Sequence, residues 1–371
     1  MAVYLINLAA VTLFSILAQR SAGYDPGRLI DGEHKPNTWF VMFIVLSLTL
    51  VAGLRFVVGT DYSNYFYMYK QMAWGEATVD WSEPGLPVIM WTLSRFTKEP
   101  YLMFFITALA CNLLSVYAMR AMAPTQSFWL TMYLFICTHV YYASFNALRQ
   151  ALAIAIILMV APYLFRKQFW PFAAGVLVAA LFHTTALVML PFYFIVHRPA
   201  WSPMMWVLIG TMLGVWALFE VLYNAAFSLL ADTRFAGYTL ENARGVQPIR
   251  ILVALAPVLL AFVFRKRLAD IPNSHVIVNL CVVGVLFMLL ADKQLFLARM
   301  GMYFSCFLPL LLPMFIRIFP QKGIRILVTC GILVCYLAYT MVLLPVDSHL
   351  LPYRSLFSKP PGFTFHDLPF L

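Results

Sequence analysis

The chain alternates long apolar runs with short polar segments, and most of the runs are long enough to cross a membrane. About twenty apolar residues span the hydrocarbon core of a bilayer as a helix. This pattern predicts membrane-spanning helices over residues 2–19, 38–56, 101–119, 127–146, 148–165, 204–223, 249–264, 275–291, 297–317 and 324–344.

One further apolar run, residues 169–197, is too long for a single crossing. As one helix it would measure about 44 Å, against a hydrocarbon core of about 30 Å. The charged loops on either side require the run to enter and leave the membrane on the same side. We therefore expect two short helices that meet near His183, either as a re-entrant pair or as two thin crossings.

Composition supports an all-α, polytopic integral membrane protein. Apolar residues make up 63% of the chain and charged residues 11%, whereas a soluble domain has about half and about a quarter; the mean hydropathy is +0.84. The first run lacks a basic leader and a small-residue cleavage pattern, so we expect a retained transmembrane helix. The pattern predicts a single integral membrane domain over residues 1–371 with about twelve membrane-entering helices.

The basic residues determine the predicted orientation. The net charge is +10, but the basic residues are scattered singly or in short groups at helix ends, which argues against a nucleic-acid partner and favours membrane topology. Loops containing Arg166–Lys167, Arg265–Arg267 and Arg317–Arg325 are predicted to be cytoplasmic. Both termini are then outside, and the outer segments are the loops 57–100 and 224–248 and the C-terminal tail 345–371.

The first outer loop is predicted to contain two interfacial helices. One begins after Thr60 and Asp61, whose side chains can cap it, and carries an aromatic stripe that includes Tyr62 and Tyr65. Such a stripe is typical of a membrane-interface belt. The other helix begins at 82–84, where a capping serine precedes a glutamate and a proline.

Arginines gather at the predicted outer ends of the spans. They are Arg55, Arg149 (followed by Gln150), Arg250, Arg299 (followed one turn later by Tyr303) and Arg354 (preceded by Tyr353). Guanidinium groups bind phosphate through paired, charge-assisted hydrogen bonds, so such a cluster suits a lipid-linked diphosphate. Taken singly, Arg55 can also be a snorkelling anchor, whereas an ionisable residue placed like Arg149 indicates a functional site.

Three residues are candidates for a general base. Asp61 and Glu83 lie in the first outer loop, although each can serve simply as a helix cap or first-turn acid. His183 lies at the predicted helix break, where irregular backbone is tolerated mainly beside a cavity. A neutral histidine there suits proton transfer near neutral pH, and an ordinary packed histidine is the alternative.

Several of these pieces resemble, in order, the EpsG-type members of the Wzy polysaccharide polymerases. The pieces are RFVVGTDYSNY (55–65), Glu83–Gly85, NALRQALA (146–153), Phe182–Leu187, Arg299 with Tyr303–Phe304, and Pro352–Arg354. The resemblance covers nearly the whole chain except 224–248, where no motif matches.

The resemblance implies an enzyme of the bacterial inner membrane with its active site on the periplasmic side. Such an enzyme transfers a growing glycan from undecaprenyl diphosphate to the non-reducing end of an incoming lipid-linked repeat unit. The lipid-linked oligosaccharide is thus donor and acceptor, membrane lipids surround the protein, and a chain-length regulator is a conceivable partner. Arg149 and Arg299 would hold the diphosphate, with Arg55, Arg250 and Arg354 as further candidates for this role or for glycan contacts. The tyrosines of the first outer loop would stack on sugars and hold the interface.

No metal-ligand motif is present, so we expect neither metal nor cofactor. Two other functions remain open. A membrane glycosyltransferase that uses a polyprenyl-phosphate sugar is compatible with Asp61, although the loop lacks a pair of adjacent acids. A flippase or transporter commonly has internal repeats and charges near the midplane, neither of which the sequence shows. A membrane O-acetyltransferase is less favoured, because no paired histidine–arginine signature is evident.

Overall fold

A computed structural model describes residues 1–24, 34–230, 246–346 and 349–361. These residues form an all-helical structure apart from one two-stranded hairpin. The chain divides into two compact units, unit 1 with residues 1–187 and 319–371 and unit 2 with residues 188–318. Each unit is described by itself.

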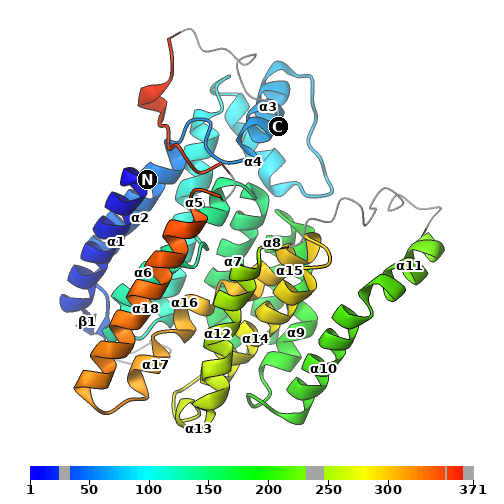
Figure 1. The fold of residues 1–371 in the computed structure, drawn as a ribbon. Coiled ribbons are helices and arrows are strands. Elements are labelled where there is room, and N and C mark those ends of the chain that lie inside the picture. Colours follow the sequence, from blue (N-terminus) through cyan, green and yellow to red (C-terminus); the bar gives the residue numbers. More distant parts are fainter. Residues whose placement is uncertain (25–33, 231–245, 347–348, 362–371) are drawn as a thin grey trace. The chain divides into compact units, whose positions relative to one another are not determined.

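Unit 1 contains the N-terminal helices and the last long helix (Figure 1). Its elements are α1 (Ala2–Arg20), β1 (Gly23–Tyr24), β2 (His34–Lys35), α2 (Thr38–Gly53), α3 (Tyr62–Trp74), α4 (Gly85–Ser94), α5 (Tyr101–Met122), η1 (Thr125–Ser127), α6 (Phe128–Cys137), η2 (Tyr142–Phe145), α7 (Leu148–Phe165), α8 (Phe169–Ala180), α18 (Lys322–Leu343) and η5 (Leu356–Ser358). The helix η3 (Thr184–Val188) ends at the boundary between the units.

Unit 2 is built around a buried central helix. Its elements are α9 (Met189–Val196), α10 (Pro203–Ala217), α11 (Phe219–Leu230), α12 (Pro248–Val263), α13 (Arg265–Leu268), α14 (Ser274–Leu290), α15 (Phe296–Ser305), α16 (Leu308–Leu311) and α17 (Met314–Arg317). Helix α14 is buried along most of its length and packs against α9, α10, α12 and α15.

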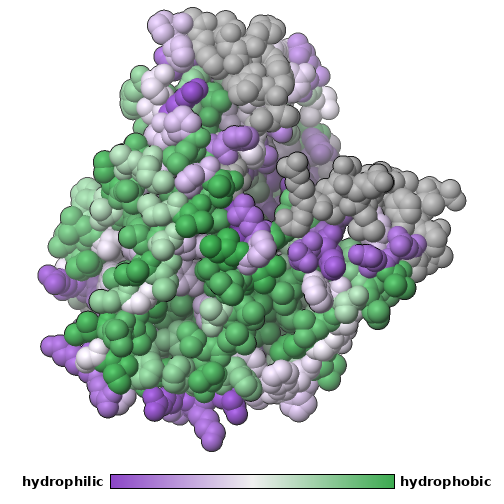
Figure 2. All heavy atoms as spheres, viewed as in Figure 1, coloured by the Kyte–Doolittle hydropathy of each residue, from purple (hydrophilic) through white to green (hydrophobic). Residues whose placement is uncertain are grey.

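Helices predominate because a segment within the hydrocarbon core must satisfy its backbone hydrogen bonds internally. Among the described residues, five helical segments are long and apolar enough to cross a membrane: α1, α5, α7, Phe296–Arg317 and α18. Shorter apolar helices make up most of the other predicted spans. On α18 the exposed side chains include Leu327 and Val334, and Figure 2 shows this face apolar with hydrophilic residues beyond its lower end. The chain is therefore a multi-pass membrane protein, while the number of twelve membrane entries stays a prediction.

Three predicted spans are interrupted. The run 127–146 forms a helix only to Cys137, because His139 adopts a left-handed backbone conformation with φ of 66° and the chain then turns into η2. The run 297–317 divides into α15, α16 and α17, because Pro309 and Pro313 have no N–H for the helix ladder. The run 204–223 divides at Leu218 into α10 and α11.

The run 169–197 breaks as the sequence predicts. Helix α8 ends at Ala180, and His183 lies in the turn before η3. The N–H groups of Phe182 and His183 both bond to the carbonyl of Ala179, which closes this turn. The break therefore presents the His183 side chain from irregular backbone.

The outer segments predicted for unit 1 gather at one of its ends. The Tyr4 hydroxyl at the start of α1 donates to the carbonyl of Leu350 at 2.8 Å, and the Tyr353 hydroxyl donates to the carbonyl of Val51 near the end of α2. Figure 1 shows α3 and α4 at the same end of the unit as the start of α1. The N-terminus, the first large loop and the C-terminal segment thus share one end, as the predicted topology requires.

The two helices of the first loop form, but their predicted side-chain caps do not. Asp61 precedes α3 without a capping hydrogen bond to that helix. Helix α4 begins at Gly85, and the Ser82 hydroxyl donates to the Asp80 carboxylate instead of capping it. Glu83 points away from the α4 backbone toward another part of unit 1.

Candidate functional site

The loop before α4 is joined to the turn after α8. The N–H of Gly85 donates to the carbonyl of Leu181 at 2.8 Å. The two segments approach so closely that a Cβ on Gly85 would lie 2.7 Å from the ring of Phe182. This contact brings together Glu83 and His183, which the sequence places a hundred positions apart.

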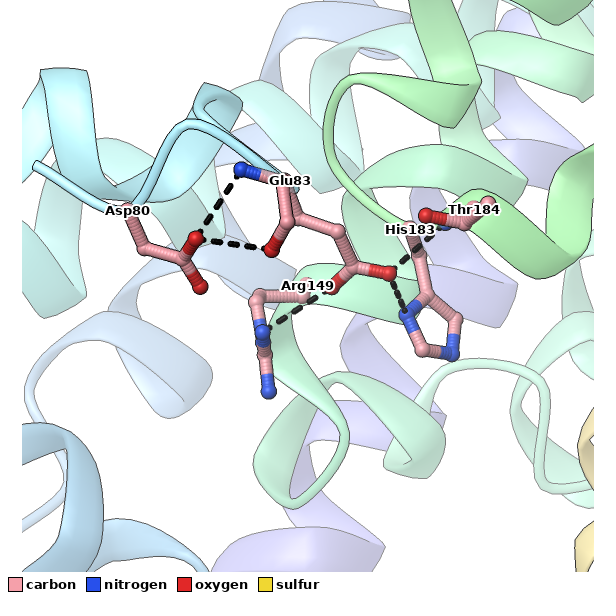
Figure 3. Close-up of polar contacts among 6 residues, drawn as sticks. Asp80, Glu83, Arg149, His183 and Thr184 are labelled. Carbon is pink, nitrogen blue, oxygen red and sulfur yellow. Dashed lines mark hydrogen bonds and ion pairs between the residues drawn. The ribbon is translucent and has the colours of Figure 1, made fainter. Parts of the chain in front are cut away.

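The Glu83 carboxylate connects three groups (Figure 3). Its Oε1 lies 3.0 Å from Nδ1 of His183 and accepts the backbone N–H of Thr184 at 2.8 Å. Its other oxygen, Oε2, lies 2.9 Å from Nη1 of Arg149. One carboxylate therefore orients both the histidine and the arginine that the sequence singles out.

The site is shielded, and Nε2 of His183 is itself buried. The side chains of Glu83 and His183 are each 13% exposed, and that of Arg149 is 36% exposed. Burial acts to raise the pKa of the Glu83 carboxyl, but the Thr184 N–H and His183 outweigh it and the pKa lies below its usual value. Glu83 is thus an anion at neutral pH, and Figure 3 shows the second terminal nitrogen of Arg149 pointing away from it.

Arg149 is placed by a second contact between distant segments. The Asn146 side-chain oxygen accepts hydrogen bonds from the N–H of Thr60 at 2.7 Å and from its hydroxyl at 3.1 Å. Gly59 permits this approach, because its φ is +99° and a Cβ there would lie 2.4 Å from the carbonyl oxygen of Phe145. The loop before α3 is thereby fixed against the start of α7, whose first turn carries Arg149.

Tyr65 and Asp61 belong to the same cluster. Burial raises the pKa of the Tyr65 hydroxyl, the Asp61 carboxylate raises it further, and hydrogen bonds from Arg149 act in the opposite direction. Tyr65 is only 7% exposed, so its ring is not available to stack on a sugar. Its hydroxyl contacts Arg149 instead. Asp61 is half-buried and lies near this pair.

Three other predicted substrate contacts are buried, which corrects their predicted role. Tyr62 stacks on Phe104 with ring centroids 4.4 Å apart and belongs to the apolar core of unit 1. Gln150 faces inward on α7, and Tyr303 on α15 is buried within unit 2. A side chain in a close-packed interior cannot reach a substrate without displacing its neighbours.

Arg55 is also buried, at 1% exposure, so in this structure its guanidinium does not snorkel to the membrane surface and is not exposed to a ligand. Its guanidinium lies between the rings of Phe104 and Phe145, 5.0 and 5.1 Å from their centroids, and donates to the carbonyl of Ala52 at the end of α2. The aromatic faces and the negative end of the helix dipole partly offset the cost of burying this charge. Arg55 therefore serves the packing of unit 1.

The C-terminal segment closes over the same region. Residues 54–56 exchange backbone hydrogen bonds with residues 354–356, and the N–H of Gly59 donates to the carbonyl of His349. Tyr353 is half-buried and its hydroxyl is bound to the chain, whereas Arg354 remains exposed. Of Tyr353 and Arg354, Arg354 is the one whose side chain can still meet a ligand.

Arg250 and Arg299 belong to unit 2. Arg299 is exposed on α15, and Arg250 is half-buried in the first turn of α12. A joint phosphate site with Arg149 stays a prediction, because the two units are described separately. The loop 224–248 and the tail beyond residue 361 lie largely or wholly outside the described residues.

Sequence reasoning missed two contributors to the site. The Thr184 N–H and the Asn146 side chain carry no chemical signature on their own, and only the contact between segments gives them a role. Within the described ranges, no three His, Cys, Asp or Glu side chains gather as a metal site would require.

The comparisons with known proteins give one match. A model of the EpsG family matches residues 38–355. This range includes the Glu83, Arg149 and His183 cluster. No curated protein and no solved structure matches the chain.

Proposed function

The chain belongs to the EpsG family, and from this premise we propose that it is a polysaccharide polymerase of the bacterial inner membrane. The family is associated with glycosyltransferase-like polymerase activity. The proposed reaction transfers the growing glycan from undecaprenyl diphosphate to the non-reducing end of an incoming lipid-linked repeat unit. It takes place at the periplasmic face.

One observation carries the proposal: Glu83 holds a histidine and an arginine within one shielded cluster. Glycosyl transfer to a hydroxyl needs a group that accepts the hydroxyl proton, and a lipid diphosphate leaving group needs cations that stabilise its departing charge. His183 and Arg149 are suited to these two roles. Glu83 is then a positioning residue for both.

The proposed step moves one proton and exchanges one bond at the anomeric carbon of the donor sugar. His183 takes the proton from the acceptor hydroxyl through Nε2, since its Nδ1 faces Glu83. Nε2 is buried in this structure, so the side chains around it must move to admit the hydroxyl. The hydroxyl oxygen forms a bond to the anomeric carbon of the donor sugar. The bond between that carbon and the diphosphate oxygen breaks, and the electron pair leaves with undecaprenyl diphosphate. Arg149 stabilises the charge on the leaving group, and Arg299 is proposed as a second cation for it.

Asp61 remains a second candidate base, because it lies beside Tyr65 in the same cluster. The geometry favours His183, whose ring is already fixed by a carboxylate in the manner of a histidine base. In this proposal Glu83 does not itself take the proton, because its low pKa makes it a weak base.

Surface polysaccharide from cells that lack the gene tests the proposal. Complementation with the wild-type gene should restore a ladder of polymer on a gel, whereas Arg149→Ala or Arg299→Ala should leave a single repeat unit at normal protein levels. Arg149→Lys should restore only part of the ladder, because lysine keeps the charge but loses the planar fork. Wild-type ladders in both alanine variants would refute the site. Loss of even the single unit in cells without the gene would point to flipping or to assembly of the unit.

A further inference from the structure

The loop that carries Glu83 also presents an exposed indole. Trp81 is 77% exposed and lies two residues before Glu83, a chain distance of at most about 7 Å between Cα atoms. Unlike Trp39 and Trp170, which stand in the first turns of α2 and α8, Trp81 lies in a loop between two short helices. The indole of Trp81 is therefore presented by the same loop that carries Glu83.

The backbone around Trp81 is held in place by its neighbours. Asp80 Oδ1 accepts the N–H of Ser82 at 2.9 Å and its hydroxyl at 2.7 Å (Figure 3). These bonds from Ser82 keep the pKa of the Asp80 carboxyl below its usual value, and the nearby Arg149 adds to the effect. The loop therefore offers an ionised, exposed carboxylate next to an exposed aromatic ring.

We propose that Trp81 and Asp80 form a subsite for the non-reducing-end sugar of the acceptor. This inference rests on the proposed function. A pyranose has an apolar C–H face that packs on an indole, and its hydroxyls donate to a carboxylate. Recognition by an aromatic surface and a few placed polar groups is the usual composition of a small-ligand site.

Charge identifies which part of the substrate fits here. The Asp80 carboxylate repels a diphosphate, so this side of the cluster suits an uncharged or amino sugar and not the lipid-linked end of the donor. The acceptor hydroxyl must lie near His183, which Glu83 holds, and Trp81 is joined to Glu83 by the same short loop. Tyr62 and Tyr65, the tyrosines of the first outer loop that the sequence suggested for sugar stacking, are buried, and Trp81 takes the role assigned to them.

Acceptor kinetics test the subsite in purified enzyme, with lipid-linked repeat units as the donor and the lipid-free repeat-unit oligosaccharide as the separately varied acceptor. Trp81→Ala should raise the KM for the acceptor about tenfold and leave the KM for the donor unchanged, since a lost aromatic contact weakens binding by about that factor. Trp81→Phe should restore most of the affinity, and Asp80→Asn should raise the acceptor KM by a smaller factor. Phe96→Ala is the matched control, because Phe96 is 80% exposed in the same loop region but lies past the end of α4, away from Glu83 in sequence.

Binding can also be measured without turnover. The repeat-unit oligosaccharide, released from its lipid carrier by mild acid, should give saturation-transfer NMR signals with wild-type and Phe96→Ala protein and weaker signals with Trp81→Ala at the same concentrations. An acceptor KM unchanged in Trp81→Ala, as a membrane anchor at this position would give, overturns the subsite. So does an absence of oligosaccharide binding to an active wild-type enzyme. An inactive wild-type enzyme would instead refute the proposed function.

Discussion

Oε1 of Glu83 lies 3.0 Å from Nδ1 of His183, and the same oxygen accepts the N–H of the next residue, Thr184. An ionised carboxylate only accepts hydrogen bonds, so Nδ1 must carry the hydrogen in this contact. In the neutral ring Nε2 is then the basic nitrogen. The position of one glutamate thus selects the tautomer that a proton acceptor needs.

This relationship predicts how substitution of Glu83 affects the reaction. Glu83→Gln keeps the shape but removes the negative charge, and we expect polymerisation to fall about 10- to 100-fold, the usual worth of a hydrogen bond to a charged group. The acidic limb of the pH–rate profile should move to lower pH, because the imidazolium loses the anion that stabilises it. Initial rates in reconstituted membranes from pH 5 to pH 9 measure both effects.

A double-mutant cycle separates positioning from packing. If Glu83 acts through His183, Glu83→Gln should cost less in a His183→Ala background than in the wild type, and the two effects should not be additive. The loss that remains in that background reports its contact with Arg149. Additive losses, or a pH profile that does not move, would show that Glu83 does not act through His183.

The same carboxylate predicts a dependence of stability on pH. The pKa of Glu83 is lower in the folded state than in a free peptide, so its stabilising effect is present above the ordinary glutamate pKa and is lost as the pH falls through the folded value. Wild-type protein should have a higher Tm than Glu83→Gln near pH 6, and the difference should shrink toward pH 3. Thermal unfolding in detergent measures it, and a difference that grows with acid would contradict the assignment.

The sequence predicted the class of fold and the position of the break near His183, because both follow from the lengths of apolar runs. It did not predict the interruption at His139, since a left-handed backbone at a histidine has no apolar signature. The breaks at Pro309 and Pro313 could have been foreseen from the residue type, but the continuous hydropathy of 297–317 concealed them.

The sequence singled out the residues of the candidate site but did not show how they contact one another. Glu83, Arg149 and His183 were all singled out, yet their contact depends on long-range pairing such as that of Gly85 with Leu181, which no local pattern encodes. The sequence placed the Arg55 side chain at the membrane surface, whereas it lies between the rings of Phe104 and Phe145. The sequence pattern of an arginine at the end of an apolar run is the same in both cases.

Gly59 and Gly75 form a natural pair for testing how the site is held. Both have positive φ, but a Cβ on Gly59 would collide with the Phe145 carbonyl, whereas a Cβ on Gly75 would have nothing within 4 Å. Gly75→Ala should cost only the backbone penalty of about 1–2 kcal/mol and keep polymerisation. Gly59→Ala should separate the Thr60 loop from Asn146 and abolish polymerisation, as measured by the surface ladder at matched protein levels. Equal activity of the two variants would show that this contact does not position Arg149.

Arg55 provides the test that distinguishes packing from substrate binding. Burying a charge carries a desolvation cost that an apolar side chain of similar size avoids, so Arg55→Met should fold, keep its Tm within a few degrees and retain the polymer ladder. Arg55→Lys keeps the charge but not the planar contact with the two rings, and it should be the less stable variant. If Arg55 instead bound the diphosphate, the order of activity would be reversed: Arg55→Lys would be partly active and Arg55→Met inactive. Surface polysaccharide and Tm measured together on the two variants decide between these roles, and an inactive but stable Arg55→Met protein would return Arg55 to the binding site.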